Sequence, residues 1–277
     1  MCRWNAYFGE PLLIDELLYR TEHGLIDESL HSRMGAETTN GDGFGLGWYT
    51  PGQEQPGRYR SVNPAWNDEN LRDLASHVES PLFLAHIRAA VGSPVQQTNC
   101  HPFRHGRWLF VHNGLLHGFH DMRRDLLLAV EPPLFEGISG SADSELLFYL
   151  ALTFGFEDDP IGGVERAIGL VEATGEAHGI EYPFQGTVGF SDGERLWAVR
   201  YSSEHSSRSL FISRDVRAVR ELHPDNPRLQ ALADETRVIV SEPLSDLSGA
   251  WLEVPESTAL VVQAGADEQL PFTPSRP

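Results

Sequence analysis

The first residue able to do chemistry is Cys2, which directly follows Met1. Cells commonly remove the initiator methionine, and its removal would leave Cys2 with both a thiol and a free α-amino group. An α-amino group has a pKa of roughly 7.7 to 8.0, so near neutral pH part of it can accept the thiol proton as sulfur attacks a carbonyl. A cysteine at this position therefore supplies a nucleophile and its own base.

Asn113 and Gly114 could supply the hydrogen-bond donors that acyl transfer needs. They follow the apolar run 108–112, which we expect to form a buried strand. A side-chain amide and a backbone N–H could there point together at a developing oxyanion, and one such donor is worth on the order of 100- to 1000-fold in rate. Asn-Gly is also a common turn pair, so by itself it favours a turn.

Arg88 and Asp143 could bind the two charged groups of an amino acid. Arg88 ends the buried run 83–87, where a permanent charge needs an anion, and its planar fork suits a carboxylate. Asp143 lies at a predicted helix start and could bind an ammonium group. Each also has a structural alternative, which is an ion pair for Arg88 and helix capping for Asp143. If both face one cleft, they would bracket an α-amino acid.

The order of the predicted elements indicates how these residues could meet. Strands near both ends of the chain and helices in the middle favour helices packed against sheets over alternating βαβ units. Asp192-Gly193 predicts a tight hairpin. We expect one domain over residues 1–264 and a loose C-terminal tail over residues 265–277. The predicted strands are 3–8, 83–88, 108–112, 187–191, 196–201, 210–213, 238–241 and 260–263. The predicted helices are 12–20, a helix that starts at 141–144 and continues through the apolar stretch 146–154, and 164–176.

Composition argues against several classes of function. The formal charge of −19 would repel a phosphate backbone, so nucleic acid is not an expected partner. All 21 basic residues are arginine, which excludes a Schiff-base lysine, a pyridoxal phosphate lysine and a phosphate-loop lysine, and we expect no cofactor. No run approaches the ~18 apolar residues of a membrane helix and no signal peptide is evident, so we expect a cytoplasmic chain without a membrane partner.

Taken in order, the motifs resemble those of the class II glutamine amidotransferases, which belong to the N-terminal nucleophile hydrolases. The resemblance is specific up to Glu145 and general beyond it. Several ordered motifs identify a family much more strongly than any one of them. The matching stretches are MCR at 1–3, NGDGFG at 40–45, AHIRA at 85–89, TNCHPF at 98–103, VHNG at 111–114 and SADSE at 141–145.

The family pattern implies a role for each matching residue. Cys2 would be the nucleophile with its own amine as the base. Asn113 and Gly114 would form the oxyanion hole. Arg88 would bind the glutamyl α-carboxylate, and Asp143 would bind the α-amino group. The fold that the resemblance implies is α+β, a four-layer αββα sandwich of two antiparallel sheets.

The resemblance also implies a substrate class. The stretch 37–41 departs from the arginine-glycine pair of many relatives, and the length leaves no room for the second domain with which large synthases use ammonia. The chain is more similar to the small γ-glutamyl hydrolases of ergothioneine biosynthesis and glutathione degradation. We expect a cysteine amidohydrolase acting on the small molecule glutamine or on a γ-glutamyl conjugate, with Trp4, Asn5 and Trp66 suggested for the leaving-group side. The alternative is a glutaminase subunit that delivers ammonia to a separate synthase.

Two alternatives come from other classes. One is a non-catalytic module that binds γ-glutamyl groups. The other is a metallohydrolase, although Pro102 and Gly106 argue against a helix that would align His101 with His105, and no H-E-x-x-H pattern appears. We expect no metal, and we expect His101 to support the wall of the substrate site. The histidines considered are His86, His101, His105, His112, His117 and His120.

Overall fold

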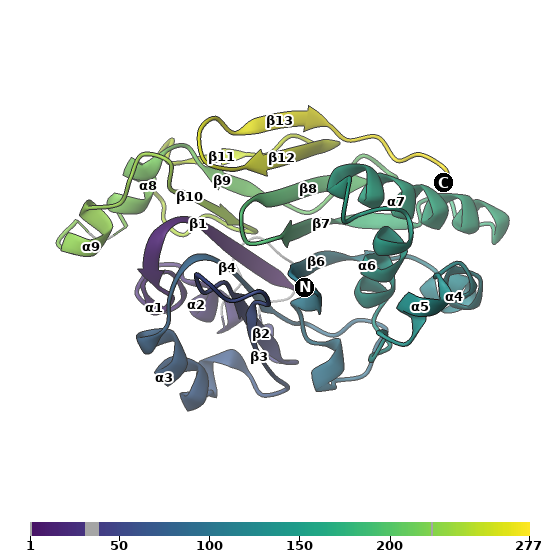
Figure 1. The fold of residues 1–277 in the computed structure, drawn as a ribbon, viewed down its shortest axis with the longest axis horizontal. Coiled ribbons are helices and arrows are strands. Elements are labelled where there is room, and N and C mark those ends of the chain that lie inside the picture. The colour runs from purple at the N-terminus through teal and green to yellow at the C-terminus, as the bar shows by residue number, and fades with distance from the viewer. Residues whose placement is uncertain (1, 31–38, 223) are drawn as a thin grey trace.

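Two antiparallel sheets stack face to face at the centre of the molecule, and helices cover both outer faces (Figure 1). The computed structural model describes residues 2–30, 39–222 and 224–277. Met1 and Glu37, which entered the sequence argument, lie outside the described residues. The predicted α+β, four-layer αββα sandwich is confirmed.

The first sheet has the strand order β11-β9-β10-β1-β4-β2-β3, with β1 between β10 and β4. Asn5 lies opposite Val240 of β10, and Trp4 lies opposite His86 of β4. The strands are β1 Arg3–Leu13, β2 Phe44–Trp48, β3 Gly57–Ser61, β4 Glu79–Ile87, β9 Phe211–Ser213, β10 Arg237–Val240 and β11 Trp251–Glu253. The outer face carries α1 Asp15–Leu18, α2 Leu25–Leu30, α3 Glu69–His77, α8 Val216–Arg220 and α9 Pro227–Gln230.

The second sheet has the order β13-β12-β8-β7-β6-β5. The predicted hairpin is confirmed, because Ser191 pairs with Leu196 and Gly193 has a φ of 92° in the turn. No helix of the described residues is long and apolar enough to cross a bilayer. The strands are β5 Phe103–His105, β6 Trp108–Leu116, β7 Phe184–Ser191, β8 Leu196–Ser202, β12 Thr258–Val262 and β13 Glu268–Pro271, and the helices are α4 Phe119–Leu128, α5 Pro132–Phe135, α6 Asp143–Thr153 and α7 Pro160–Ala177.

Side-chain alternation along the central strands decides which residues face the space between the sheets. On β1, Trp4 and Ala6 pack into the core between the sheets, whereas Tyr7 packs against the helices. On β6, Leu109 belongs to the core between the sheets and Phe110 to the core under the helices. Even-numbered residues of β1 up to Phe8, where the register shifts, and odd-numbered residues of β6 therefore face the opposite sheet.

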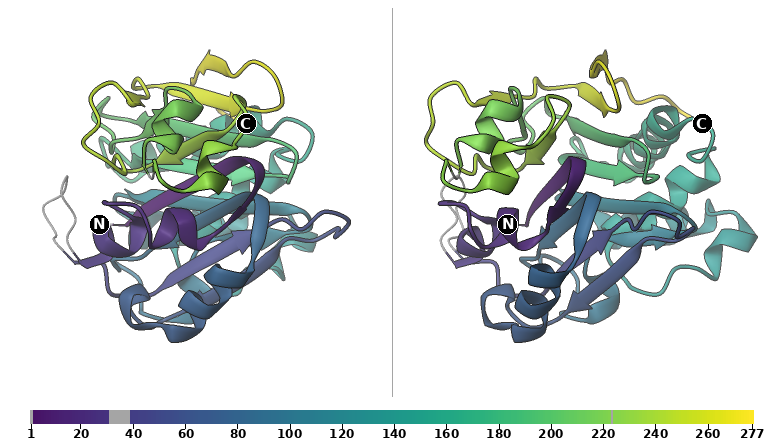
Figure 2. Two further views of the ribbon diagram at one scale, coloured as in Figure 1. Left: turned by 90° about the vertical axis from the view of Figure 1, so that its left-hand side faces the viewer. Right: turned by 60° about the vertical axis from the view of Figure 1, so that its left-hand side comes forward.

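Three connections cross between the sheets. One is residues 254–257 between β11 and β12, and the other two lie on opposite sides of β1. Residues 88–102 lead from β4 to β5, and residues 203–210 lead from β8 to β9, which lies beyond β10. In Figure 2 the green elements that follow β8 accordingly lie on one side of the purple β1, and the blue elements β2 to β4 lie on the other. The start of β1 is thus flanked by two crossings.

The C-terminal segment differs from the loose tail predicted over residues 265–277. Glu268–Pro271 forms β13 and pairs with β12, and Phe272 is buried. The Thr273 N–H donates to the Glu165 carboxylate of α7 at 2.8 Å. The side chains of β13 are exposed, so the strand has no apolar alternation of its own, and its pairing depends on β12.

The predicted helix 12–20 is shorter in the structure. β1 continues as far as Leu13, which pairs with Glu79, and only Asp15–Leu18 forms α1. Sheet pairing therefore outweighs the helical spacing of these apolar residues. In contrast, the helix predicted over 164–176 lies entirely inside α7.

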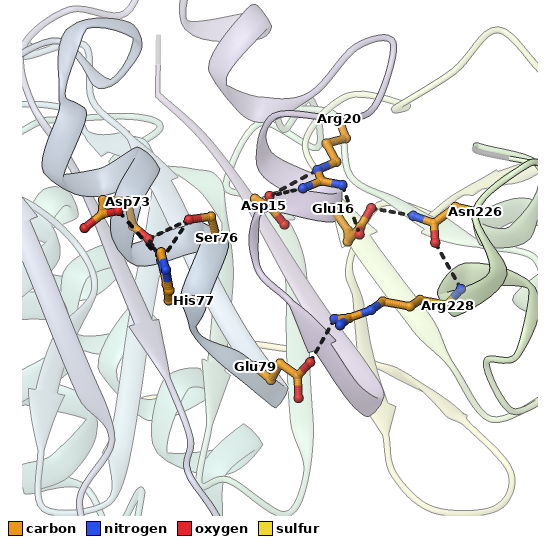
Figure 3. Close-up of polar contacts among 9 residues, drawn as sticks. All are labelled: Asp15, Glu16, Arg20, Asp73, Ser76, His77, Glu79, Asn226 and Arg228. Carbon is orange, nitrogen blue, oxygen red and sulfur yellow. Dashed lines mark hydrogen bonds and ion pairs between the residues drawn. The ribbon is translucent and has the colours of Figure 1, made fainter.

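A polar network fastens α1 to α9 and β4 (Figure 3). The Glu16 carboxylate, only 2% exposed, accepts a hydrogen bond from Asn226 at 2.7 Å and lies 3.5 Å from the Arg20 guanidinium. Next to Asn226, Arg228 pairs with Glu79 at 2.8 Å on the surface. Polar contacts thus supplement the apolar packing that holds the short helices against the first sheet.

Candidate active site

A single cavity of about 300 Å³ at the start of β1 is lined by all six site residues predicted from the sequence. Alternation accounts for three of them, because Cys2 and Arg88 continue the inward-facing positions of β1 and β4, and Asn113 is an inward-facing position of β6. The six are Cys2, Arg88, His101, Asn113, Gly114 and Asp143, and the other lining residues are Ala89, Val91, Ser93, His112, Leu115, Ala142, Ser144 and Arg208.

Cys2 lies immediately before β1 and is half-buried. Its Sγ accepts a hydrogen bond from the Ala89 N–H at 3.4 Å. Burial raises the pKa of the Cys2 thiol, and the Asp143 carboxylate adds to this, while the Ala89 hydrogen bond and the Arg88 charge oppose it. The thiol is therefore largely protonated near neutral pH, and its attack on a carbonyl requires a base.

Arg3 holds the backbone behind Cys2. Its Nη1 donates to the Cys2 carbonyl oxygen at 2.8 Å, and its guanidinium pairs with Glu242 just beyond β10. Arg3 is 3% exposed and Glu242 is 2% exposed, so the pair is buried. The ion pair lies on the opposite face of β1 from the cavity. It holds the backbone of Cys2 in place through the hydrogen bond from Arg3 to the Cys2 carbonyl oxygen.

Glu242→Ala is expected to lower the free energy of unfolding by about 3 kcal/mol or more, because it leaves the Arg3 charge buried without its carboxylate. Urea unfolding measures the change. The exposed pair of Arg228 with Glu79 provides the control, and Arg228→Ala is expected to cost less than about 1 kcal/mol. Similar small losses in both variants would show that the buried pair does not anchor the start of β1.

Asn113 and Gly114 lie inside β6, so the alternative of an Asn-Gly turn is wrong. The Asn113 side chain is 2% exposed and lines the cavity, so its amide faces the space that a ligand would occupy. Only glycine fits at position 114, because a Cβ there would lie 2.1 Å from the Gln185 carbonyl oxygen and 2.3 Å from His112 Nε2. The strand thus presents an amide and an unobstructed backbone to the cavity.

Arg88 is a buried cation whose hydrogen-bond acceptors among the described residues are neutral oxygens. Its guanidinium donates to Ser93 Oγ at 2.7 Å and to the carbonyl oxygens of Pro94 at 3.1 Å and Asp42 at 3.4 Å. The structural ion pair considered for it is not formed with any described residue. Arg88 is 3% exposed, so the burial of its charge favours an anion that enters the cavity.

Asp143 is the first residue of α6, and Ala142 occupies the capping position, so the helix-capping alternative is wrong in that form. One carboxylate oxygen accepts from the Leu116 N–H at 3.0 Å, and the other accepts from the Ser144 N–H at 2.8 Å. The bond from Leu116 joins the start of α6 to the end of β6. No described cation pairs with Asp143, so its negative charge is free to meet a positive group.

Two neutral histidines, His101 and His112, line the inner wall, and His86 packs against His101. The His86 and His101 rings are tilted by 36° with their centroids 4.0 Å apart, and none of their four ring nitrogens has a hydrogen-bond partner among the described residues. Burial lowers the pKa of His86 to about 3, with Arg88 adding, and lowers the pKa of His101 well below its usual range. His112 shares a hydrogen bond of 2.9 Å with Ser144. The wall is therefore uncharged at neutral pH.

The histidines of the metallohydrolase alternative do not gather at one point. His105 contacts the edge of Tyr149, and His117 and His120 lie exposed around the start of α4. In residues 2–30, 39–222 and 224–277, no three His, Cys, Asp or Glu side chains are placed to share a metal ion.

The residues suggested for the leaving-group side do not line the cavity. Trp4 is buried between the sheets and donates to Thr187 at 3.0 Å, Asn5 faces the helices, and Trp66 packs near Gly41. The structure places Arg208 on the cavity wall instead. Arg208 lies in a serine-rich segment without apolar periodicity, so the sequence did not indicate that it would line the cavity.

Comparison with known proteins identifies the family of this site. A family model described as glutamine amidotransferases class-II matches residues 22–276. The chain belongs to this family. Among the class-II relatives, the probable glutamine amidotransferase DUG3 of Saccharomyces cerevisiae is 31% identical over 293 residues, covering 95% of this chain and 82% of that protein. The gamma-glutamyl-hercynylcysteine sulfoxide hydrolase of Mycobacterium tuberculosis is 25% identical, covering 92% of this chain and 90% of that protein.

Solved class-II structures share the fold. A glutamine aminotransferase class-II domain protein from Silicibacter pomeroyi superposes with a TM-score of 0.75 at 33% identity, covering 99% of this chain and 100% of that one. The glutamine phosphoribosylpyrophosphate amidotransferase of B. subtilis gives a TM-score of 0.62 at 16% identity and covers 99% of this chain and 50% of that one. The second likeness concerns the fold alone. The chain is thus a class-II glutamine amidotransferase family enzyme with γ-glutamyl hydrolases among its relatives.

Proposed function

We propose that this protein hydrolyses the γ-glutamyl amide of glutamine or of a γ-glutamyl conjugate through a thioester on Cys2. The observation that carries the proposal is one cavity that contains a thiol, the Asn113 amide on a strand, and a cation and an anion that form no ion pair with any described residue. The names of the relatives support this substrate class, since one is a probable glutamine amidotransferase and another a gamma-glutamyl-hercynylcysteine sulfoxide hydrolase.

In the proposed reaction the Cys2 thiol adds to the γ-carbonyl carbon, and its proton moves to the free α-amino group of Cys2. The carbonyl oxygen becomes an oxyanion that accepts hydrogen bonds from the Asn113 amide and the Gly114 N–H. The C–N bond then breaks as the protonated amine returns its proton to the leaving nitrogen. Water, activated by the same amine, cleaves the thioester to glutamate and restores the thiol.

Substrate recognition is assigned to the two unpaired charges. Arg88 would bind the glutamyl α-carboxylate through its planar fork, and Asp143 would bind the α-ammonium group. Each interaction would supply the counter-charge that the cavity lacks. His101 would support this wall as a neutral apolar surface, because protonation of its buried ring is strongly disfavoured.

A panel of amides tests this assignment. We expect L-γ-glutamyl amides to be hydrolysed with release of glutamate. The matched glutaryl amide lacks only the α-amino group, and the matched 4-aminobutyryl amide lacks only the α-carboxylate. We expect each of these two analogues to lose about 10- to 100-fold or more in kcat/KM. Mass spectrometry of the products measures turnover, with glutamine as the reference. Hydrolysis of all three kinds of amide at equal rates would remove the basis for the roles of Arg88 and Asp143.

The fate of the amine product has one alternative within the family. If glutamine is the best substrate of the panel, the released ammonia could serve a separate synthase. If conjugates are better, the chain acts as a stand-alone hydrolase. The same panel therefore separates the two.

A further inference from the structure

The cavity contains a second arginine that the proposed reaction does not use. Arg208 is half-buried and lines the wall together with Cys2 and Asn113. The chain carries a net charge of −19, yet this one cavity holds two arginines, Arg88 and Arg208, beside the nucleophile. Such a charge in a cleft attracts an anionic group.

Arg208 and Arg88 reach the cavity from opposite sides of Cys2. Arg88 begins the crossing 88–102, next to β4, whereas Arg208 belongs to the crossing 203–210 that leads to β9. β4 and β10 flank β1 in the sheet, and β9 lies beyond β10. The nucleophile at the start of β1 therefore lies between the two guanidinium-bearing segments.

Hydrogen bonds on both sides of Arg208 fix its backbone. The Ser207 N–H and Oγ donate to the Glu256 carboxylate at 3.0 and 2.6 Å. Ser209 Oγ donates to the Ser241 carbonyl oxygen at 2.8 Å, directly after β10. Because both neighbours are anchored to the sheets, the position of Arg208 on the wall is built into the fold.

A γ-glutamyl amide in this cavity would place its glutamyl half on the Arg88 side of Cys2 and its amine half on the Arg208 side. With the α-carboxylate at Arg88 and the γ-carbonyl carbon at the Cys2 sulfur, the scissile nitrogen lies beyond the sulfur, on the side from which Arg208 approaches. Glutamine would present only an NH₂ group there. An amino acid or peptide joined through its amine would present a carboxylate.

We propose that Arg208 is a specificity-determining residue that binds a carboxylate on the amine half of the substrate. It thereby selects γ-glutamyl amino acids and γ-glutamyl peptides over glutamine and over γ-glutamyl amides of uncharged amines. The inference rests on the proposed γ-glutamyl amidohydrolase function and adds the charge of the leaving group to it.

The test compares γ-glutamylglycine with γ-glutamylglycinamide, which differ only in a carboxylate against a carboxamide. We expect the wild-type chain to favour γ-glutamylglycine by about 10- to 100-fold in kcat/KM, as for a hydrogen bond between charged groups. Arg208→Gln should remove this preference by slowing γ-glutamylglycine alone, and Arg208→Lys should retain part of it. Arg217→Gln, which removes the same charge from the exposed side of α8, should keep the full preference.

Each outcome decides the inference. Equal kcat/KM for the two substrates in the wild-type chain overturns it, whether or not Arg208→Gln folds. An Arg208→Gln chain that unfolds at the wild-type temperature but loses activity on both substrates equally also overturns it, because the residue then acts on the site as a whole. If the wild-type chain hydrolyses no γ-glutamyl amide at all, the proposed function is overturned instead.

Discussion

Cys2→Ala is expected to reduce hydrolysis of γ-glutamyl amides by about 10⁴-fold or more, because the covalent route disappears with the sulfur. The fold should survive, since Cys2 is half-buried and the hydrogen bonds of its sulfur are to the backbone of Ala89. We expect the free energy of unfolding to change by less than about 1 kcal/mol. Product formation and urea unfolding, measured on the same preparation, give both quantities.

Cys100 provides the matched control. Its thiol is fully buried, donates to the Ser61 carbonyl oxygen at 3.3 Å and does not line the cavity. Cys100→Ala should therefore cost about 1 kcal/mol or more in stability while preserving turnover. Loss of activity in both cysteine variants, or retained activity in Cys2→Ala, would contradict the assignment of the nucleophile.

A chain with any uncleaved residue ahead of Cys2 is expected to lose about 100- to 10,000-fold in kcat, which is the usual contribution of a general base. An amide nitrogen cannot accept the thiol proton, and burial raises the pKa of this thiol, so little thiolate forms without help. In the processed chain kcat/KM should rise with pH through the amine pKa of roughly 7.7 to 8.0, because only the unprotonated amine acts as a base.

One preparation can supply both forms. A protease site placed directly before Cys2 gives an extended chain, and cleavage converts it into the processed chain without other change. Activity should appear in step with cleavage followed by mass spectrometry. An extended chain as active as its cleaved product would mean that another group takes the proton.

Much of the site could be predicted from the sequence, because its residues lie next to strands that short apolar runs indicate. The apolar runs before Arg88 and Asn113 predict β4 and β6, and the position of Cys2 beside β1 follows from the first residues of the chain. The chemistry of these side chains then limits their roles. The family motifs added the order in which they occur.

Arg208 was missed because nothing near it in sequence fixes its place. The segment 203–210 is polar and irregular, and its path depends on Glu256 and Ser241, which lie tens of residues away. β13 was missed for the same reason, since an exposed edge strand is defined by its partner β12. Such features depend on tertiary contacts that local periodicity does not encode.

The most direct measurement is the mass of the N-terminal peptide from processed enzyme quenched in acid during turnover of a γ-glutamyl amide. The account predicts a fraction of this peptide that is heavier by one glutamyl residue, attached to the Cys2 sulfur and released by hydroxylamine. A glutamyl group carried by a different residue, or steady turnover during which Cys2 stays unmodified, would contradict it.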